Sequence, residues 1–170
     1  MIQQLILLGV LLDGKTHAYR LNEYVTHAMN LYADIKKSTV YYTLEKLEKD
    51  GHVEHETERE GKRPERRVYR ITEKGKLNFL QLLRDNLSEF TRTYFNDDIG
   101  IAFMDQLSTS EARELLEKKQ GMIQSALKQF KEAPDHGANW HYVISHNIAH
   151  LDADLAWIER ILNDLDQVKA

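Results

Sequence analysis

One stretch constrains the fold of this chain more than any other: KKSTVYYTLEKLEKDG, from Lys36 to Gly51. At about 100° per residue, Val40, Leu44 and Leu47 fall on one face of a helix, so this face is expected to be buried. The opposite face carries hydroxyls, tyrosines and lysines. Gly51 supplies a C-terminal stop, because glycine adopts the left-handed conformation without steric cost. The pattern predicts a short amphipathic helix with a polar outer face.

That outer face suits the major groove of DNA. Hydroxyl and phenol groups bond to phosphates or base edges, and lysines pair with phosphates. An ordinary solvated helix has the same pattern, so this stretch alone leaves two interpretations open. Its candidate DNA-binding residues are Lys36, Lys37, Ser38, Thr39, Tyr41, Tyr42 and Lys46.

Two helices are expected before this stretch and a hairpin after it. Residues 2–12 are apolar nearly all round, which predicts a buried first helix. Thr16 is expected to cap a second helix that runs from His17 to about Met29. After the third helix, HVEHETERE alternates like an exposed strand, GKRPE is typical of a turn, and RRVYRIT predicts a second strand. Helix, helix, helix, hairpin is the order of a winged helix-turn-helix.

Cations concentrate in the predicted hairpin. They are Arg59, Lys62, Arg63, Arg66, Arg67 and Arg70. A basic wing directly after a recognition helix contacts the adjacent backbone phosphates, and Lys62, Arg63 and Arg66 are the candidates for this contact. A solvated charged hairpin is the alternative interpretation.

These segments resemble the PadR-like transcriptional regulators. The resemblance rests on LILLGVL, HAYRL, STVYYTLEKLEKDGHVE and GKRPERRVYRITEKGK, which follow the family's order and spacing over about the first 76 residues. It implies a dimer that binds operator DNA, commonly as a repressor that a small molecule releases. By position, Ser38, Thr39, Tyr41, Lys62, Arg63 and Arg66 match the family's recognition helix and wing. Ala18 stands where the family usually has glycine, so the packing of the second helix is expected to differ locally.

The second half of the chain is expected to be helical. Thr72 is the expected cap of a helix to about Tyr94, with an apolar repeat formed by Leu77, Leu80, Leu83 or Leu87, and Phe90. Ser108 and Glu111 form a capping box that opens a helix to about Lys131.

The last predicted helix runs from about Asn139 to Val168 and carries a heptad pattern, which favours pairing with another long helix. We expect this seam to form a homodimer, and packing within one chain is the alternative. The candidate dimer-interface residues are Ile148, Leu151, Leu155, Ile158, Leu162 and Leu165.

Charge is divided unevenly along the 170 residues. The net charge is −4, which argues mildly against nucleic acid, yet residues 1–72 carry 12 Lys and Arg against 11 Asp and Glu. The acidity therefore belongs to the second half. An apolar content of 42% is enough for a folded core, and the chain has no cysteine. The apolar run near the N-terminus is too short to span a bilayer, so a cytoplasmic protein with no membrane partner is expected.

Other chemistry has weaker support. His146, His150 and Asp154 are spaced four apart along a helix and could hold a divalent metal, but a fourth ligand is missing and a solvated polar face is favoured. The sequence contains no phosphate-binding glycine loop and no nucleophile elbow, so no enzyme and no cofactor are expected. Tyr19, Tyr24, Trp140 and Trp157 are candidates for binding a small aromatic or amphipathic effector, although such residues more often belong to a core.

Taken together, these patterns predict a mainly α protein. A winged helix-turn-helix of three helices and a β-hairpin wing, residues 1–72, is followed by an all-helical dimerisation and effector domain, residues 73–170. The predicted function is a homodimeric transcriptional regulator that binds a palindromic operator in double-stranded DNA. The family resemblance implies that it acts as a repressor and that a small-molecule effector releases it. The alternative is a winged-helix module that docks an acidic partner protein and does not bind DNA.

Overall fold

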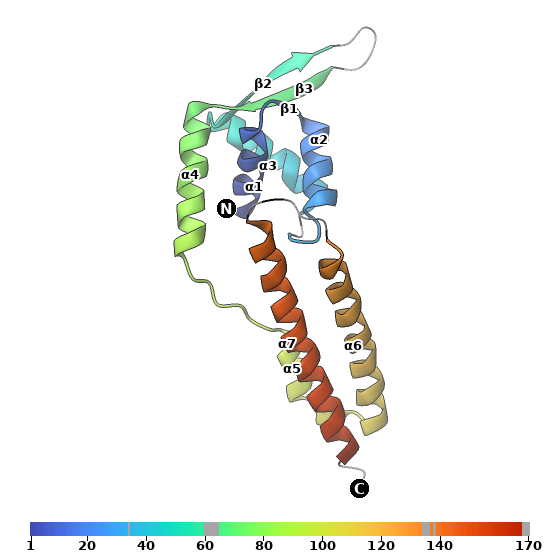
Figure 1. Ribbon diagram of the computed structural model, residues 1–170. Helices are drawn as coiled ribbons and strands as arrows, with labels where there is room; N and C mark the ends of the chain where they lie inside the picture. The colour runs from blue at the N-terminus through green and yellow to red at the C-terminus, as the bar shows by residue number, and fades with distance from the viewer. Residues whose placement is uncertain (34, 60–64, 134–136, 138, 168–170) are drawn as a thin grey trace. The chain divides into compact units, whose positions relative to one another are not determined.

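The computed structural model describes all residues except 34, 60–64, 134–136, 138 and 168–170. It forms two compact units, Met1–Arg92 and Thr93–Ala170 (Figure 1). The functional boundary expected after residue 72 stays a prediction. The first compact unit extends further than that boundary, because the helix that follows the wing packs on the first helix of the chain.

Three helical segments build the core of the first unit. These are α1 (Ile2–Leu12), α2 (Ala18–Glu23) with the π-helical turn η1 (Tyr24–Ala28), and α3 (Lys37–Lys49). The buried leucines of α1 meet the buried face of α3, whose members are Val40, Thr43, Leu44 and Leu47. The buried face predicted for the Lys36–Gly51 stretch is confirmed.

A three-stranded antiparallel sheet follows, in the order β1-β3-β2. Its strands are β1 (Thr16–His17), β2 (Val53–Glu58) and β3 (Arg66–Ile71), so the predicted hairpin is confirmed. The expectation that Thr16 caps α2 is wrong. Thr16 pairs with Tyr69 in the sheet, and the N-cap of α2 is His17, which makes no side-chain capping bond. The local sequence assigns Thr16 to a helix cap, but its pairing with β3, far along the chain, places it in the sheet.

The wing ends in a tight junction with the end of α3. Helix α4 (Glu73–Ser88) begins after Thr72, whose Oγ1 accepts a hydrogen bond from the Gly75 amide at 3.0 Å and donates to the Gly51 carbonyl at 2.8 Å. The left-handed φ of +72° at Gly51 makes this turn possible. A Cβ on Gly75 would lie 1.9 Å from the His52 carbonyl oxygen, so only glycine permits this approach.

The junction fixes which face of α4 is buried, and the predicted apolar repeat of this helix is wrong. Phe79 and Leu82 pack against the core, whereas Leu87 is 78% exposed. Leu77 and Leu80 are exposed as well. The close approach at Gly75 turns the Phe79 face toward α1, and the helix ends at Ser88 rather than near Tyr94.

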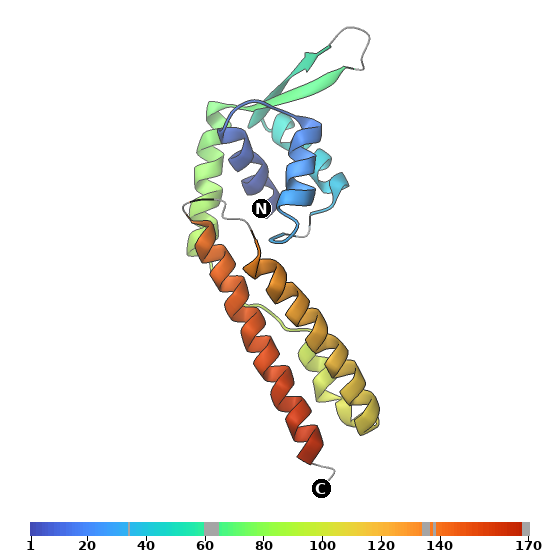
Figure 2. The ribbon, with the colours of Figure 1, turned by 45° about the vertical axis from the view of Figure 1, so that its right-hand side comes forward.

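The second unit is a helical hairpin with a short helical segment against it. Its elements are α5 (Asp97–Ala102), the 3-10 turn η2 (Met104–Gln106), α6 (Thr109–Lys131) and α7 (Trp140–Gln167). Helices α6 and α7 lie side by side and run antiparallel (Figures 1 and 2). The predicted cap is confirmed, since the Glu111 amide donates to Ser108 Oγ at 3.2 Å. The core here is small and centres on Leu116, Ile158 and Leu162.

Candidate nucleic-acid interface

The outer face of α3 presents polar side chains to solvent, as its sequence predicts. Tyr42 is 69% exposed, and Ser38 and Lys46 are exposed on the same side of the helix. Tyr42 and Lys46 line a shallow hollow together with Glu45, Lys49 and Asp50. Lys49 therefore belongs to this surface, although the candidate set from the sequence leaves it out. The hollow offers a phenol and two ammonium groups on one side of a helix.

The N-terminus of α3 concentrates positive charge. Lys36 is the N-cap in an extended conformation, Lys37 begins the helix, and the first turn contains no acidic residue. Lysines are unfavourable there because the helix dipole already places partial positive charge at this end. Exposed amide groups and cations at a helix N-terminus attract phosphate. The two lysines at the N-terminus of α3 therefore lower the stability of the helix and favour the binding of an anionic ligand. Thr39 is half-buried and Tyr41 is exposed in the same stretch.

At the end of β3 nearest the wing loop, Arg66 is held by an aromatic ring. Its guanidinium carbon lies 5.6 Å from the centre of the Tyr19 ring, within the range of a cation–π interaction. The Tyr19 hydroxyl accepts a hydrogen bond from Arg20 Nε at 3.3 Å. Two arginines thus meet at one tyrosine beside the wing. Lys62 and Arg63, the other two wing candidates, lie outside the described residues.

Part of the wing's positive charge is neutralised inside the wing. Arg70 and Glu54 are cross-strand neighbours, and Arg70 Nε lies 3.0 Å from Glu54 Oε1. A second carboxylate, that of Glu56, lies 3.9 Å from Arg70 Nη2. The number of cations in the sequence therefore overstates what this hairpin offers to phosphates, because the strand register pairs some of them with glutamates.

Another set of side chains ties the wing to α3. The hydrogen bond to the Tyr69 hydroxyl raises the pKa of the Arg67 guanidinium above its ordinary value, and the carboxylates of Glu48 and Glu45 act in the same direction. His55 Nδ1 contacts the Glu48 carboxylate of α3. Arg67 is exposed and permanently charged between wing and helix. The candidate set from the sequence leaves it out, because only the register shows that it shares a face with His55.

The candidate effector residues fall into both units. Tyr19 and Tyr24 are exposed in the first, while Trp140 and Trp157 are half-buried in the second. A single effector cavity formed by all four residues stays a prediction.

The candidate dimer residues are used differently along α7. Ile158 is 0% exposed, and it packs with Leu162 against Leu116 of the same chain. These two residues fill an internal seam, so a partner cannot reach them in this packing. Leu165 packs against the same cluster, whereas Ile148, Leu151 and Leu155 are half-buried.

The histidine pair on α7 is exposed. His146 Nε2 and His150 Nε2 lie 3.1 Å apart. Within the part of the chain that the structure describes, no three His, Asp, Glu or Cys side chains are grouped to hold a metal ion.

Comparison with known proteins supports the likeness to the PadR-like regulators. Residues 7–81 match the model of the Transcriptional regulator PadR-like family. The negative transcriptional regulator PadR of Bacillus subtilis is 25% identical over 181 residues, which cover 95% of this chain and 96% of that protein. The chain is similar to the PadR-like family over residues 7–81 and to B. subtilis PadR over nearly its whole length.

Solved structures with the same PadR-like fold match nearly the whole chain. B. subtilis PadR in complex with operator DNA has a TM-score of 0.79 and 20% identity, covering 97% of this chain and 99% of that chain. B. subtilis PadR in complex with p-coumaric acid has a TM-score of 0.77 and 22% identity, covering 98% and 99%. The Vibrio cholerae virulence activator AphA has a TM-score of 0.74 and 14% identity, covering 98% and 99%.

The winged helix-turn-helix predicted from the sequence is confirmed by these PadR-like structures. The family and its structural neighbours are transcriptional regulators, so the prediction that the chain is not an enzyme is confirmed as well. Among the described helices, none combines the length and the apolar character needed to cross a membrane.

Proposed function

We propose that this chain is a homodimeric transcriptional repressor that binds a palindromic operator. Helix α3 enters the major groove, and the β2–β3 wing contacts neighbouring phosphates. The observation that carries the proposal is the exposed polar face of α3 with two lysines at its N-terminus. That face is joined to an arginine-bearing wing through Thr72 and the Glu48–His55 contact.

The relatives support operator binding, repression and the binding of a small effector. B. subtilis PadR has been solved with operator DNA and with p-coumaric acid, and the curated relative is a negative regulator. The virulence activator AphA has a similar fold, so repression rests on the likeness to PadR rather than on the fold. A small effector would release the DNA. The four aromatic candidates on the two units remain predictions for its site.

The second unit supports dimerisation, on a surface other than the internal seam. Apolar side chains of α5 and α6 stay exposed, among them Ile99, Phe103, Leu115 and Met122. Phe103, Leu115 and Met122 also line an apolar groove of about 540 Å³. Large exposed apolar surfaces of this kind mark interaction sites. A second copy across a two-fold axis would cover them and place two α3 helices about 34 Å apart, on half-sites one helical turn apart.

Binding to DNA at two salt concentrations tests the proposal. Sequencing the DNA that co-purifies with the protein identifies an operator, and titrations then compare this operator with random duplex. Phosphate contacts give a log-log salt slope of roughly −0.9 for each phosphate neutralised. Lys37→Ala should make the slope about one unit shallower. The matched control is Lys128→Ala, an exposed lysine of α6 whose ammonium lies 3.8 Å from a Glu132 carboxylate oxygen.

Two results would contradict the proposal. A protein that binds neither operator nor random duplex, or that binds without salt dependence, does not read DNA through this surface. The basic wing would then serve to dock an acidic partner protein. Equal losses for Lys37→Ala and Lys128→Ala would show that α3 has no special part in binding.

A further inference from the structure

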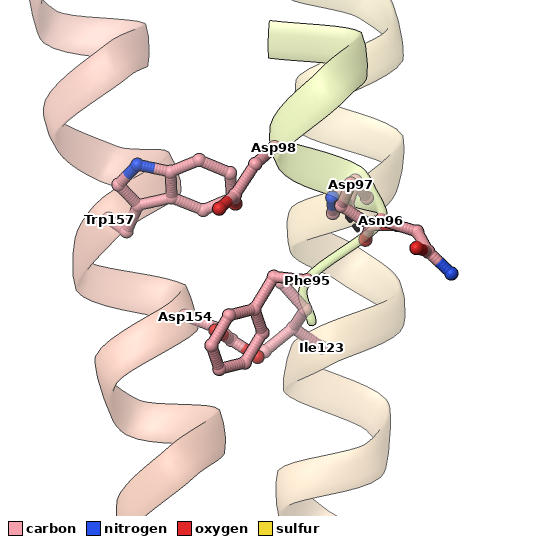
Figure 3. Close-up of a pocket in the computed structure, with 8 residues that line it drawn as sticks. Phe95, Asn96, Asp97, Asp98, Ile123, Asp154 and Trp157 are labelled. Atoms are coloured by element: carbon pink, nitrogen blue, oxygen red, sulfur yellow. Dashed lines mark hydrogen bonds and ion pairs between the residues drawn. The ribbon is translucent and has the colours of Figure 1, made fainter. Parts of the chain in front are cut away.

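The second unit contains a cavity of about 490 Å³ (Figure 3). This volume lies within the range of small-molecule sites, about 300 to 1,000 Å³. Figure 3 shows Phe95, in the segment before α5, and Asp98 of α5 on the side that faces Asp154 and Trp157 of α7. The other lining residues are Asn96, Asp97, Lys119 and Ile123. The cavity thus combines two aromatic walls with three carboxylates and one ammonium group.

The single cation of this cavity already has its partners. Lys119 Nζ lies 2.5 Å from Asp97 Oδ2, and 5.5 Å from the centre of the Trp157 ring. The lysine therefore neutralises one of the three carboxylates. Its ammonium group also lies within cation–π range of Trp157, so part of the surface of that ring already faces a positive charge.

Two carboxylates of the cavity remain uncompensated. Asp98 and Asp154 form no ion pair with any residue that the structure describes. Figure 3 shows the Asp98 carboxylate beside the Trp157 ring and that of Asp154 beside the Phe95 ring. Asp98 is exposed and Asp154 is half-buried. An unpaired carboxylate and an aromatic face each attract a cation. A carboxylic acid ligand would bring a third unpaired negative charge and be repelled.

We propose that this cavity binds small organic cations: an amine or quaternary ammonium with an apolar or aromatic body. The ammonium lies between the carboxylates of Asp98 and Asp154, and the body packs against Phe95 and Trp157. The lining of the cavity alone supports cation binding. Its role as the site of the effector rests on the proposed function. This ligand class differs from p-coumaric acid, with which B. subtilis PadR was solved.

Tryptophan fluorescence tests the proposal directly. The chain has two tryptophans, so Trp140→Phe in the full-length protein leaves Trp157 as the sole reporter. Three probes of matched shape differ in charge: phenethylamine, 2-phenylethanol and 3-phenylpropionate. We expect the cation to bind about tenfold or more tightly than the neutral alcohol, and the anion to bind most weakly. Asp154→Asn and Asp98→Asn should each reduce phenethylamine affinity about tenfold.

Asp152→Asn is the matched control, because Asp152 is exposed on the same helix and does not line the cavity. Its phenethylamine affinity should equal that of the parent. Thermal unfolding of each variant separates loss of the site from loss of the fold. The proposal is overturned if phenylpropionate binds as tightly as phenethylamine, or if Asp154→Asn and Asp152→Asn behave alike. It is also overturned if the fluorescence of Trp157 does not change on addition of phenethylamine, as would happen where a second copy of the chain fills the cavity.

The experiment distinguishes this proposal from the proposed function. All measurements of phenethylamine binding are made without DNA. A protein that binds phenethylamine but no operator therefore supports the cavity as a binding site and contradicts the proposed regulatory function. A protein that binds its operator but none of the three probes shows the opposite failure. Where both hold, adding phenethylamine to the operator complex should weaken it, and the Asp154→Asn variant should respond less.

Discussion

The two units of this chain bury their apolar residues to different extents. The first buries leucines and valines from α1, α2, α3 and the sheet in one continuous core. The core of the second centres on Leu116, Ile158 and Leu162, and large side chains such as Phe103 and Met122 stay exposed. Burial of apolar surface is what offsets the entropy of ordering a chain, and the first unit has the larger continuous core. In the homodimer proposed above, a second copy would cover the exposed apolar side chains of the second unit.

The largest effect on operator affinity is expected from blocking the dimer interface proposed on the second unit. Leu115 is 52% exposed and Met122 is exposed on the same apolar groove. Leu115→Asp with Met122→Asp would bury carboxylates in an apolar interface, which costs several kcal/mol. Sedimentation should show monomers, and operator affinity should fall by about a thousandfold because the two recognition helices are no longer linked.

The control for that variant changes exposed polar positions on α6. Gln124→Asp with Ser125→Asp introduces the same charge and should leave both dimerisation and operator affinity unchanged. A Leu115→Asp, Met122→Asp protein that remains dimeric would place the interface elsewhere. The half-buried residues Ile148, Leu151 and Leu155 of α7 would then be the next candidates.

The next effect should come from the tight packing of the first unit. Gly75→Ala places a methyl group where the His52 carbonyl oxygen lies, so the wing and α4 have to move apart. Overpacking against backbone should lower the free energy of unfolding by about 3 kcal/mol. Chemical denaturation followed by circular dichroism measures this loss. An unchanged midpoint would mean that α4 is not held against the α3–β2 turn.

A loss of sequence discrimination is expected from the surface of the first unit. Tyr42→Ala should reduce the preference for operator over random DNA by about 1 to 3 kcal/mol if the phenol reads a base edge. The matched control is Tyr142→Ala in α7, since the two tyrosines are 69% and 67% exposed. Equal affinities of both variants for the operator would remove Tyr42 from base recognition.

A smaller effect is expected where a ring supports a cation. Tyr19→Ala removes the surface on which Arg66 rests and should weaken binding to operator and random DNA alike, by about 0.5 to 1 kcal/mol. Tyr19→Phe keeps the ring and should bind as the parent does. Tyr24→Ala serves as the comparison, because Tyr24 has a similar exposure in the same unit. A Tyr19→Phe variant as weak as Tyr19→Ala would assign the effect to the hydroxyl that meets Arg20.

The smallest effect is expected from the loosely packed unit. A Cβ on Gly121, inside α6, would meet nothing within 4 Å. Gly121→Ala should therefore stabilise the protein by about 0.5 to 1 kcal/mol, opposite in sign to Gly75→Ala. Differential scanning calorimetry of the two variants compares them. A destabilised Gly121→Ala would indicate that a second copy approaches α6 closely at this position.

Features set by neighbouring residues could be predicted from the sequence. The caps at Thr72 and Ser108 and the stop at Gly51 depend on bonds within a few residues, and all three occur as expected. Features set by distant contacts could not. Thr16 joins a strand 53 residues further along the chain at Tyr69, and nothing local distinguishes that strand residue from a cap.

The same limit applies to the candidate sites. A heptad pattern predicts that Ile158 and Leu162 pack against apolar side chains. It does not predict whether those side chains belong to the same chain. Counting arginines in the hairpin ignores the register that pairs Arg70 with Glu54. Lys62 and Arg63 lie outside the described residues, so their part in DNA binding stays a prediction.

The hydrogen bond from Thr72 to the turn after α3 couples the wing to the recognition helix, which affects how DNA would be released. Thr72, directly after the wing, donates to the carbonyl groups of Gly51 and His52 in the turn after α3, so we expect the wing and the recognition helix to move together. Each half-site is then gained or lost in a single event, with groove and phosphate contacts breaking together. In the homodimer proposed above, we therefore expect an effector to act by changing the spacing between the two α3 helices and not by retracting the wing alone. Its action should appear as a shift in the preferred separation of half-sites.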